Sequence, residues 1–123
     1  LINKKEINDL VKLNVDLTYA IRDSLIKGNL PKIGNQLDQG WKNKKQYSKK
    51  ISNERLDKIY DTAINNGAIG GKLLGAGGGG FFLFYCDPIK RWNVVKSLID
   101  IKAKVVEFNF ETDGLMSWKV RKK

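Results

Sequence analysis

The feature that most constrains the fold is a run of glycines, which occupy five of the six positions from Gly75 to Gly80 between two apolar segments. A tight hairpin needs only one or two residues with positive φ. Each further glycine costs about 0.5–1 kcal/mol of backbone entropy relative to alanine, so folding alone does not require this many. A backbone that approaches an anionic ligand or another segment at contact distance does require them, because no Cβ then intervenes.

Two nucleotide-binding motifs are close to this pattern, and both fail. The glycines formally satisfy G-x-G-x-x-G, but Phe81–Tyr85 follows as a strand-like segment where a dinucleotide fold needs a helix. A P-loop needs a metal-binding hydroxyl where Leu73 stands and a first glycine where Asn66 stands. The sequence therefore predicts a strand, a glycine loop and a second strand, with backbone amides available to phosphate or substrate.

The candidate site consists of this loop and one charged neighbour. Lys72 is the only charged residue between Gly67 and Cys86. It either supplies positive charge for a phosphate or a facing domain, or is an exposed strand lysine with a solvated ammonium group. The loop residues of the candidate site are Gly75, Ala76, Gly77, Gly78, Gly79 and Gly80.

The composition is that of one soluble globular domain spanning residues 1–123, with 41% hydrophobic and 29% charged residues. The longest apolar run, Phe81–Cys86, is far below the ~20 residues that span a bilayer, and no secretory pattern is present. We therefore expect a cytoplasmic protein that has no membrane partner. Cys86 is the only cysteine, which excludes an internal disulfide and favours a buried, inert thiol.

No residue of the chain is a candidate catalytic group. The sequence contains no histidine, so a Ser–His–Asp or Cys–His site is impossible within it. Its carboxylates are dispersed, with Asp87 expected as a helix cap and Asp113 in a turn, and no metal site is predicted. Trp41, Trp92 and Trp118 are expected in the core or in an interface with another domain.

The net charge of +10 raises the alternative of a basic nucleic-acid-binding α+β module. The charge is spread evenly, however, since residues 1–66 carry 13 basic and 8 acidic groups and residues 67–123 carry 10 and 5. A solvated surface is therefore the favoured interpretation and nucleic acid the disfavoured partner. A regulatory domain that binds a small molecule without catalysis also stays open.

Three helices are predicted before the glycine loop, over residues 5–27, 31–47 and 52–67. Apolar residues recur at three-and-four spacing in each, Gly28 ends the first, and Ser52 is the expected N-cap of the third. Leu56, Ile59, Tyr60 and Ala63 are expected to face inward from that third helix.

Four strands and one more helix are predicted from Ala68 onward. The strands are Ala68–Leu74, Phe81–Cys86, Lys104–Phe110 and Leu115–Val120, the last two joined by a turn at Thr112–Gly114. Asp87 and Pro88 start a helix whose expected buried residues are Ile89, Trp92, Val95, Leu98 and Ile99. The expected fold is α+β, a two-layer sandwich of helices on a four-stranded, largely antiparallel sheet.

The segment Lys72–Phe81, preceded by Gly67–Gly71, resembles the third signature motif of the GHMP kinases, the family named for galactokinase, homoserine kinase, mevalonate kinase and phosphomevalonate kinase. Gly40–Lys45, Ile51–Asn53 and Ile59–Tyr60 are similar to the sugar-kinase branch that acts on a heptose 7-phosphate. The resemblance runs from about residue 5 to the end and implies the ferredoxin-like C-terminal lobe of a two-lobed enzyme.

The resemblance also implies what lies outside this chain. The family's ATP-phosphate loop and its acidic base, where one is used, belong to an N-terminal lobe that is absent here, and a start at Leu1 fits an excised fragment. The intact enzyme would transfer the γ-phosphoryl group of Mg²⁺-bound ATP to a sugar, expected at the anomeric hydroxyl of a heptose 7-phosphate. Galactokinase-like and mevalonate-like substrates remain open.

For the isolated chain, the same resemblance implies a face that its own N-terminal lobe would cover. We expect this chain alone to be inactive as a kinase and to hold neither ATP nor Mg²⁺. We also expect it to self-associate through the apolar surface near Gly67–Gly80, which lobe removal would expose.

Overall fold

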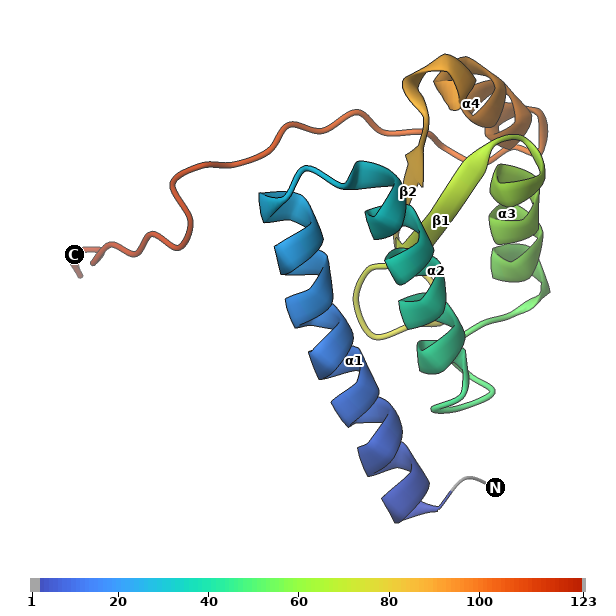
Figure 1. The fold of residues 1–123 in the computed structure, drawn as a ribbon. Coiled ribbons are helices and arrows are strands. Elements are labelled where there is room, and N and C mark those ends of the chain that lie inside the picture. Colours follow the sequence, from blue (N-terminus) through green and yellow to red (C-terminus); the bar gives the residue numbers. More distant parts are fainter. Residues whose placement is uncertain (1–2, 123) are drawn as a thin grey trace.

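The computed structural model describes residues 3–122, in which four α-helices accompany a small antiparallel sheet (Figure 1). Three helices precede the sheet and the fourth follows it, after a short 3₁₀ turn at Pro88–Lys90. The elements are α1 (Lys4–Ile26), α2 (Leu30–Lys45), α3 (Glu54–Asn65), β1 (Ala68–Leu73), β2 (Phe82–Cys86) and α4 (Arg91–Asp100). None of the helices between residues 3 and 122 combines the length and apolar character that crossing a membrane needs.

Local signals set the helix limits. The Asn3 side chain accepts the backbone N–H of Glu6 while the Glu6 carboxylate accepts that of Asn3, which starts α1 with a capping box. Gly28, at φ +70°, follows the last turn of α1 as predicted. The prediction of Ser52 as the cap of α3 was wrong, because Asn53 is extended and its side chain accepts the Leu56 N–H at 2.9 Å.

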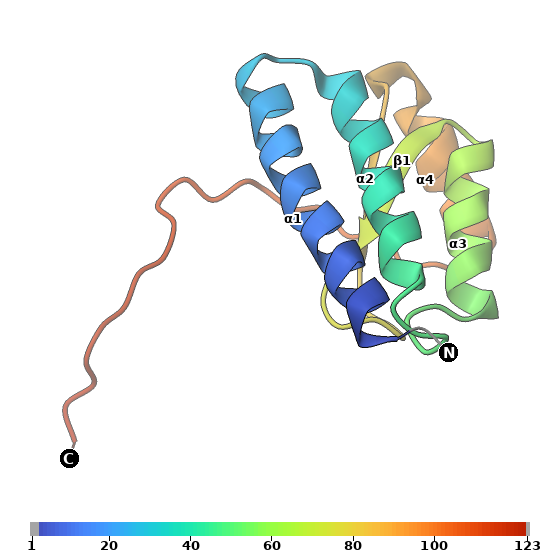
Figure 2. The ribbon, with the colours of Figure 1, turned by 60° about the horizontal axis from the view of Figure 1, so that its bottom comes forward.

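Helix α2 lies directly on β1, and glycine makes this contact possible. A Cβ placed on Gly70 would stand 1.9 Å from the carbonyl oxygen of Gly34 in α2, so the two backbones touch. Helix α1 packs along the other side of α2 (Figure 2), and Asn14 of α1 accepts a hydrogen bond from Asn43 of α2 at 3.3 Å. The last turn of α2 thereby arrives beside the end of β1.

Two clusters form the core, on either side of α3. Trp41 is fully buried and meets Phe82 edge-on, with ring centroids 5.3 Å apart, as expected of a core tryptophan. Tyr60 closes this cluster and donates its hydroxyl to Asp38 at 2.6 Å. The first cluster contains Trp41, Leu56, Tyr60 and Leu73. The second contains Ala63, Ala68, Val94 and Leu98.

The predicted four-stranded sheet was wrong, because only β1 and β2 pair among the described residues. The segments Lys104–Phe110 and Leu115–Val120 are extended and exposed, without the predicted hairpin. The first passes beside β2 and α4, and the second runs away from the helices (Figure 1). Alternating apolar residues fix which side chains share a strand face, but not whether a partner edge lies within reach. Phe110 is 89% exposed and Trp118 is 81% exposed.

The predicted buried face of α4 was wrong in part. Ile89 lies in the 3₁₀ turn and is 87% exposed, while Trp92 and Ile99 also face outward. Val94 and Leu98 are the buried residues of α4. The turn at Pro88–Lys90 is capped by Asp87, whose side chain accepts the N–H of Ile89 at 2.9 Å. The α-helix therefore begins three residues later than predicted, and a different set of its residues faces the core.

Candidate functional site

The glycine loop leaves β1 after Leu73 and returns at Phe82, which confirms the predicted order of strand, loop and strand. Its base is closed by the Leu74 N–H, which donates to the Phe81 carbonyl at 2.8 Å. Gly75, Gly77, Gly78 and Gly80 all have positive φ, between +77° and +114°. Four of the five glycines therefore occupy a backbone region that other residues rarely adopt, and only Gly79 does not.

One flank of the loop is held by the segment between α2 and α3. Gly78 donates its N–H to the Ile51 carbonyl at 2.9 Å, and the Asn53 side chain donates to the Gly78 carbonyl at 3.4 Å. A Cβ on Gly77 would lie 3.0 Å from the Ile51 side chain, so loop and segment are in close contact. The loop is thus fixed on this side and open on the other.

Most of the amide groups in the loop have no partner among the residues that the structure describes. Within residues 3–122, Gly78 is the one loop residue whose N–H donates a hydrogen bond to another protein group. The unpartnered N–H groups belong to Gly75, Ala76, Gly77, Gly79 and Gly80. Successive free N–H groups in a glycine loop can bind the oxygens of an anion, phosphate above all.

A lysine from the last turn of α2 reaches the base of this loop. The Lys44 ammonium group donates to the Gly75 carbonyl, and to the Leu73 carbonyl at 3.5 Å. Partial burial, and then the charge of Lys72, lower the pKa of Lys44. Lys72 itself is exposed on β1.

Sequence reasoning missed Lys44, because it did not single this lysine out as a candidate site residue. The neighbouring lysines of α2 are engaged elsewhere, since Lys42 pairs with Asp38 at 2.6 Å and Lys45 stands 5.5 Å from the Trp41 ring centroid. A helical signal could have singled Lys44 out, because it follows the buried Trp41 by three residues, and residues at that spacing share a helix face.

Two large apolar side chains flank the loop and stay in solvent. Leu74 is 46% exposed and Phe81 is 63% exposed, one at each end of the loop. Single exposed apolar residues are common, but a pair at the entrance of an anion-binding loop is a surface that a second domain could cover.

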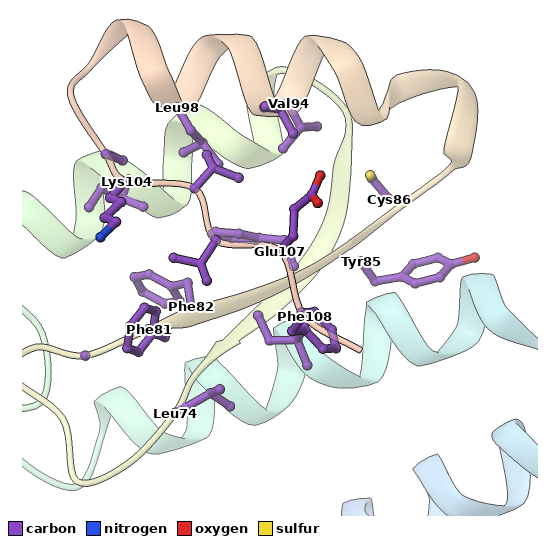
Figure 3. Close-up of a pocket in the computed structure, with 18 of the residues that line it drawn as sticks. Leu74, Phe81, Phe82, Tyr85, Cys86, Val94, Leu98, Lys104, Glu107 and Phe108 are labelled. Carbon is purple, nitrogen blue, oxygen red and sulfur yellow. The ribbon is translucent and has the colours of Figure 1, made fainter. Parts of the chain in front are cut away.

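A pocket of about 1120 Å³ lies between β2, α4 and the chain after α4, and it extends to Leu74, Gly80 and Phe81 at the glycine loop (Figure 3). Its lining is mostly apolar, with Phe82, Val94, Leu98 and Phe108 around it. Cys86 lies at its edge, half-buried, and burial raises the pKa of its thiol, so the predicted inert thiol is only partly enclosed. No group of three or more metal-ligating side chains occurs among residues 3–122, here or elsewhere.

Comparisons with known proteins point to one family. A family model for the C-terminal part of GHMP kinases matches residues 21–98. The D-glycero-alpha-D-manno-heptose 7-phosphate kinase of Campylobacter jejuni is 37% identical over 100 residues, which are 81% of this chain and 30% of that protein. A bifunctional fucokinase/GDP-fucose pyrophosphorylase of Arabidopsis thaliana is 30% identical over 94 residues, 76% of this chain and 9% of that protein.

Two solved kinase structures also resemble this chain. Mevalonate kinase of L. major, in complex with R-mevalonate, matches 80% of this chain with a TM-score of 0.61 and 26% identity. A putative sugar kinase from Campylobacter jejuni matches 69% of it with a TM-score of 0.51 and 36% identity. The chain spans only 35% and 26% of these two structures, and 30% and 9% of the two curated relatives.

Proposed function

This chain belongs to the GHMP kinases, as a match to their C-terminal domain, and we propose that it is the C-terminal lobe of an ATP-dependent sugar kinase. The observation that carries the proposal is the glycine loop, whose free N–H groups and neighbouring lysines suit phosphate. In this role residues 1–123 form one domain, and a second lobe supplies the remainder of the active site.

The glycine loop would close the active site over the reacting phosphate. Phosphoryl transfer depends on positioning and on stabilising the charge of the transferred group, more than on covalent chemistry by the protein. Free amides from Gly75 to Gly80 can donate to phosphate oxygens, and the ammonium group of Lys72 adds positive charge nearby. The chain carries no histidine, and none of its carboxylates is a candidate general acid or base. Proton transfer would therefore be carried out by residues of the second lobe.

The proposed substrates are ATP and a heptose 7-phosphate, with transfer to the anomeric hydroxyl. Support for the sugar comes from the relative of that name, which is 37% identical to this chain. The loop residues fit the phosphates of ATP, which supplies the transferred phosphoryl group. They do not fit Mg²⁺, because no cluster of metal-ligating side chains occurs among the described residues, so the ion would be held by the other lobe.

Product formation by the intact protein tests this function. The protein would be incubated with ATP and Mg²⁺ and with heptose 7-phosphate, L-fucose or R-mevalonate in turn, and ³¹P NMR would identify the new phosphate ester. We expect the heptose 7-phosphate to react best and to gain an anomeric phosphate. Absence of ATP-dependent phosphorylation with all three would refute the proposal, and turnover by residues 1–123 alone would refute the need for a second lobe.

A further inference from the structure

Two lysines beside the glycine loop carry charges that no carboxylate in the described part of the chain neutralises. The ion pairs among residues 3–122 are Arg22–Asp23, Lys42–Asp38 and Arg91–Glu107, and neither Lys44 nor Lys72 takes part in one. The two lysines are close enough for the charge of Lys72 to lower the pKa of Lys44. Two neighbouring cations without an anion are unfavourable, and a bound anion would relieve this repulsion.

The backbone explains why the two lysines are neighbours. Side chains two residues apart in a strand share a face, so Lys72 is on the face of Gly70, which rests against Gly34 of α2. Lys44 is in the last turn of that same helix. The strand and the helix therefore place both lysines where β1 becomes the loop, with the Lys44 ammonium group against the Leu73 and Gly75 carbonyls.

The donors of Lys44 are only partly used. An ammonium group has three N–H donors, and the Leu73 and Gly75 carbonyls accept two of them. The third donates to no group within residues 3–122, and the loop that carries the free N–H groups begins at the same Gly75. Main-chain amides with a fixed ammonium group beside them are a recurrent arrangement for binding phosphate.

We propose that Lys44 and Lys72, with the free amides of the glycine loop, bind a phosphate monoester dianion, and that Lys44 also holds the loop in the shape that binds it. This deepens the proposed function, on which it rests, by assigning the charged residues of the loop site. The phosphate has two sources, the ester already present on the sugar and the terminal phosphate of ATP. Both present the same chemistry to the lysines.

Binding of inorganic phosphate to residues 1–123 tests the site without requiring catalysis. Amide resonances of the loop glycines would be followed by NMR as phosphate replaces chloride at constant ionic strength. Lys44→Met and Lys72→Met should each weaken phosphate binding about tenfold, the typical effect of losing one charge-assisted contact. Lys32→Met is the matched control, since it removes the same charge from the first turn of α2, about 18 Å away along the helix.

The two variants separate binding from loop folding. Lys44→Met also removes hydrogen bonds to the loop, whereas Lys72 donates none to any group within residues 3–122. Weaker binding in Lys72→Met therefore cannot result from a misshapen loop. Equal phosphate affinity in the wild type and in all three variants, or no shift of the loop amides, would overturn the proposal.

Kinetics of the intact enzyme identify the source of the phosphate. If the site holds the sugar ester, Lys72→Met raises the KM for heptose 7-phosphate and leaves the KM for ATP unchanged; the reverse result assigns it to ATP. Either result supports the site, and unchanged KM values for both would overturn it. Phosphate binding by the chain without kinase activity of the intact protein would instead refute the proposed function and keep the site.

Discussion

Replacing Gly79 by alanine tests whether the glycine at this position is needed for folding or for binding a ligand. Gly79 is the one glycine of the loop without positive φ, and a Cβ at this position meets no atom within 4 Å. Inside this chain the added methyl group therefore causes neither backbone strain nor a clash. Alanine also restricts the unfolded chain, so we expect the free energy of unfolding to rise by about 0.4–1 kcal/mol or to stay level.

Activity should respond in the opposite direction. If a phosphate or the other lobe lies against the bare backbone at Gly79, the methyl group takes part of that space and shields the Gly79 N–H. Loss of one donor to the transferred group typically costs about 2.7–4 kcal/mol, and a partial loss of about 1.4 kcal/mol already lowers kcat/KM tenfold. We expect a fall of at least about tenfold in the intact enzyme.

The assays are urea unfolding of residues 1–123 and steady-state phosphorylation by the intact enzyme. Gly77→Ala is the informative comparison, because Gly77 has φ +110° and its Cβ would lie 3.0 Å from Ile51. That variant should lose both stability, by at least about 1 kcal/mol, and activity. A Gly79→Ala enzyme with full activity and unchanged KM values would refute the argument that the bare backbone serves a ligand at this position.

Three further predictions concern the fold around the site. Gly70→Ala should lower the free energy of unfolding, measured in urea, by about 3 kcal/mol or more, since its Cβ would stand 1.9 Å from the Gly34 carbonyl oxygen. A loss below about 1 kcal/mol would contradict the contact between the two backbones. Burial, and then the hydrogen bond to Asp38, raise the pKa of Tyr60, so the native state keeps a proton that the unfolded state loses above about pH 10. Stability should therefore fall as pH rises past that value, and Tyr60→Phe should make the fall shallower; an unchanged slope in urea midpoints would exclude Tyr60 as its source. Phe81→Ser should reduce self-association of the isolated chain, measured by sedimentation velocity, because Phe81 is 63% exposed beside the loop. A wild-type chain that stays monomeric at high concentration would contradict an exposed lobe interface.

The parts of the fold that sequence predicted well are those with local causes. Helix spacing, Gly28 as a stop and the strand, loop and strand around Gly75–Gly80 depend on residues a few positions apart. The error at Ser52 is also local, since Ser52 and Asn53 are both good caps and only backbone geometry selects Asn53.

The parts that sequence did not predict depend on distant partners. Val106, Phe108 and Phe110 alternate as a strand would, yet strand formation needs an edge to pair with, and none is joined to them in the described chain. The role of Lys44 has the same origin, because it follows from the contact of Gly34 with Gly70, which places the end of α2 at the start of the loop.

The open side of the glycine loop and its exposed apolar flanks have one common explanation. Free amides alone could be satisfied by water, and exposed Leu74 and Phe81 alone could be ordinary surface. Water, however, weakens each hydrogen bond to phosphate, and excluding it needs an apolar cover around the polar contacts. A lobe that docks on Leu74 and Phe81 would supply that cover at the two ends of the loop, and would strengthen binding by Lys44 and the amides only once it had closed.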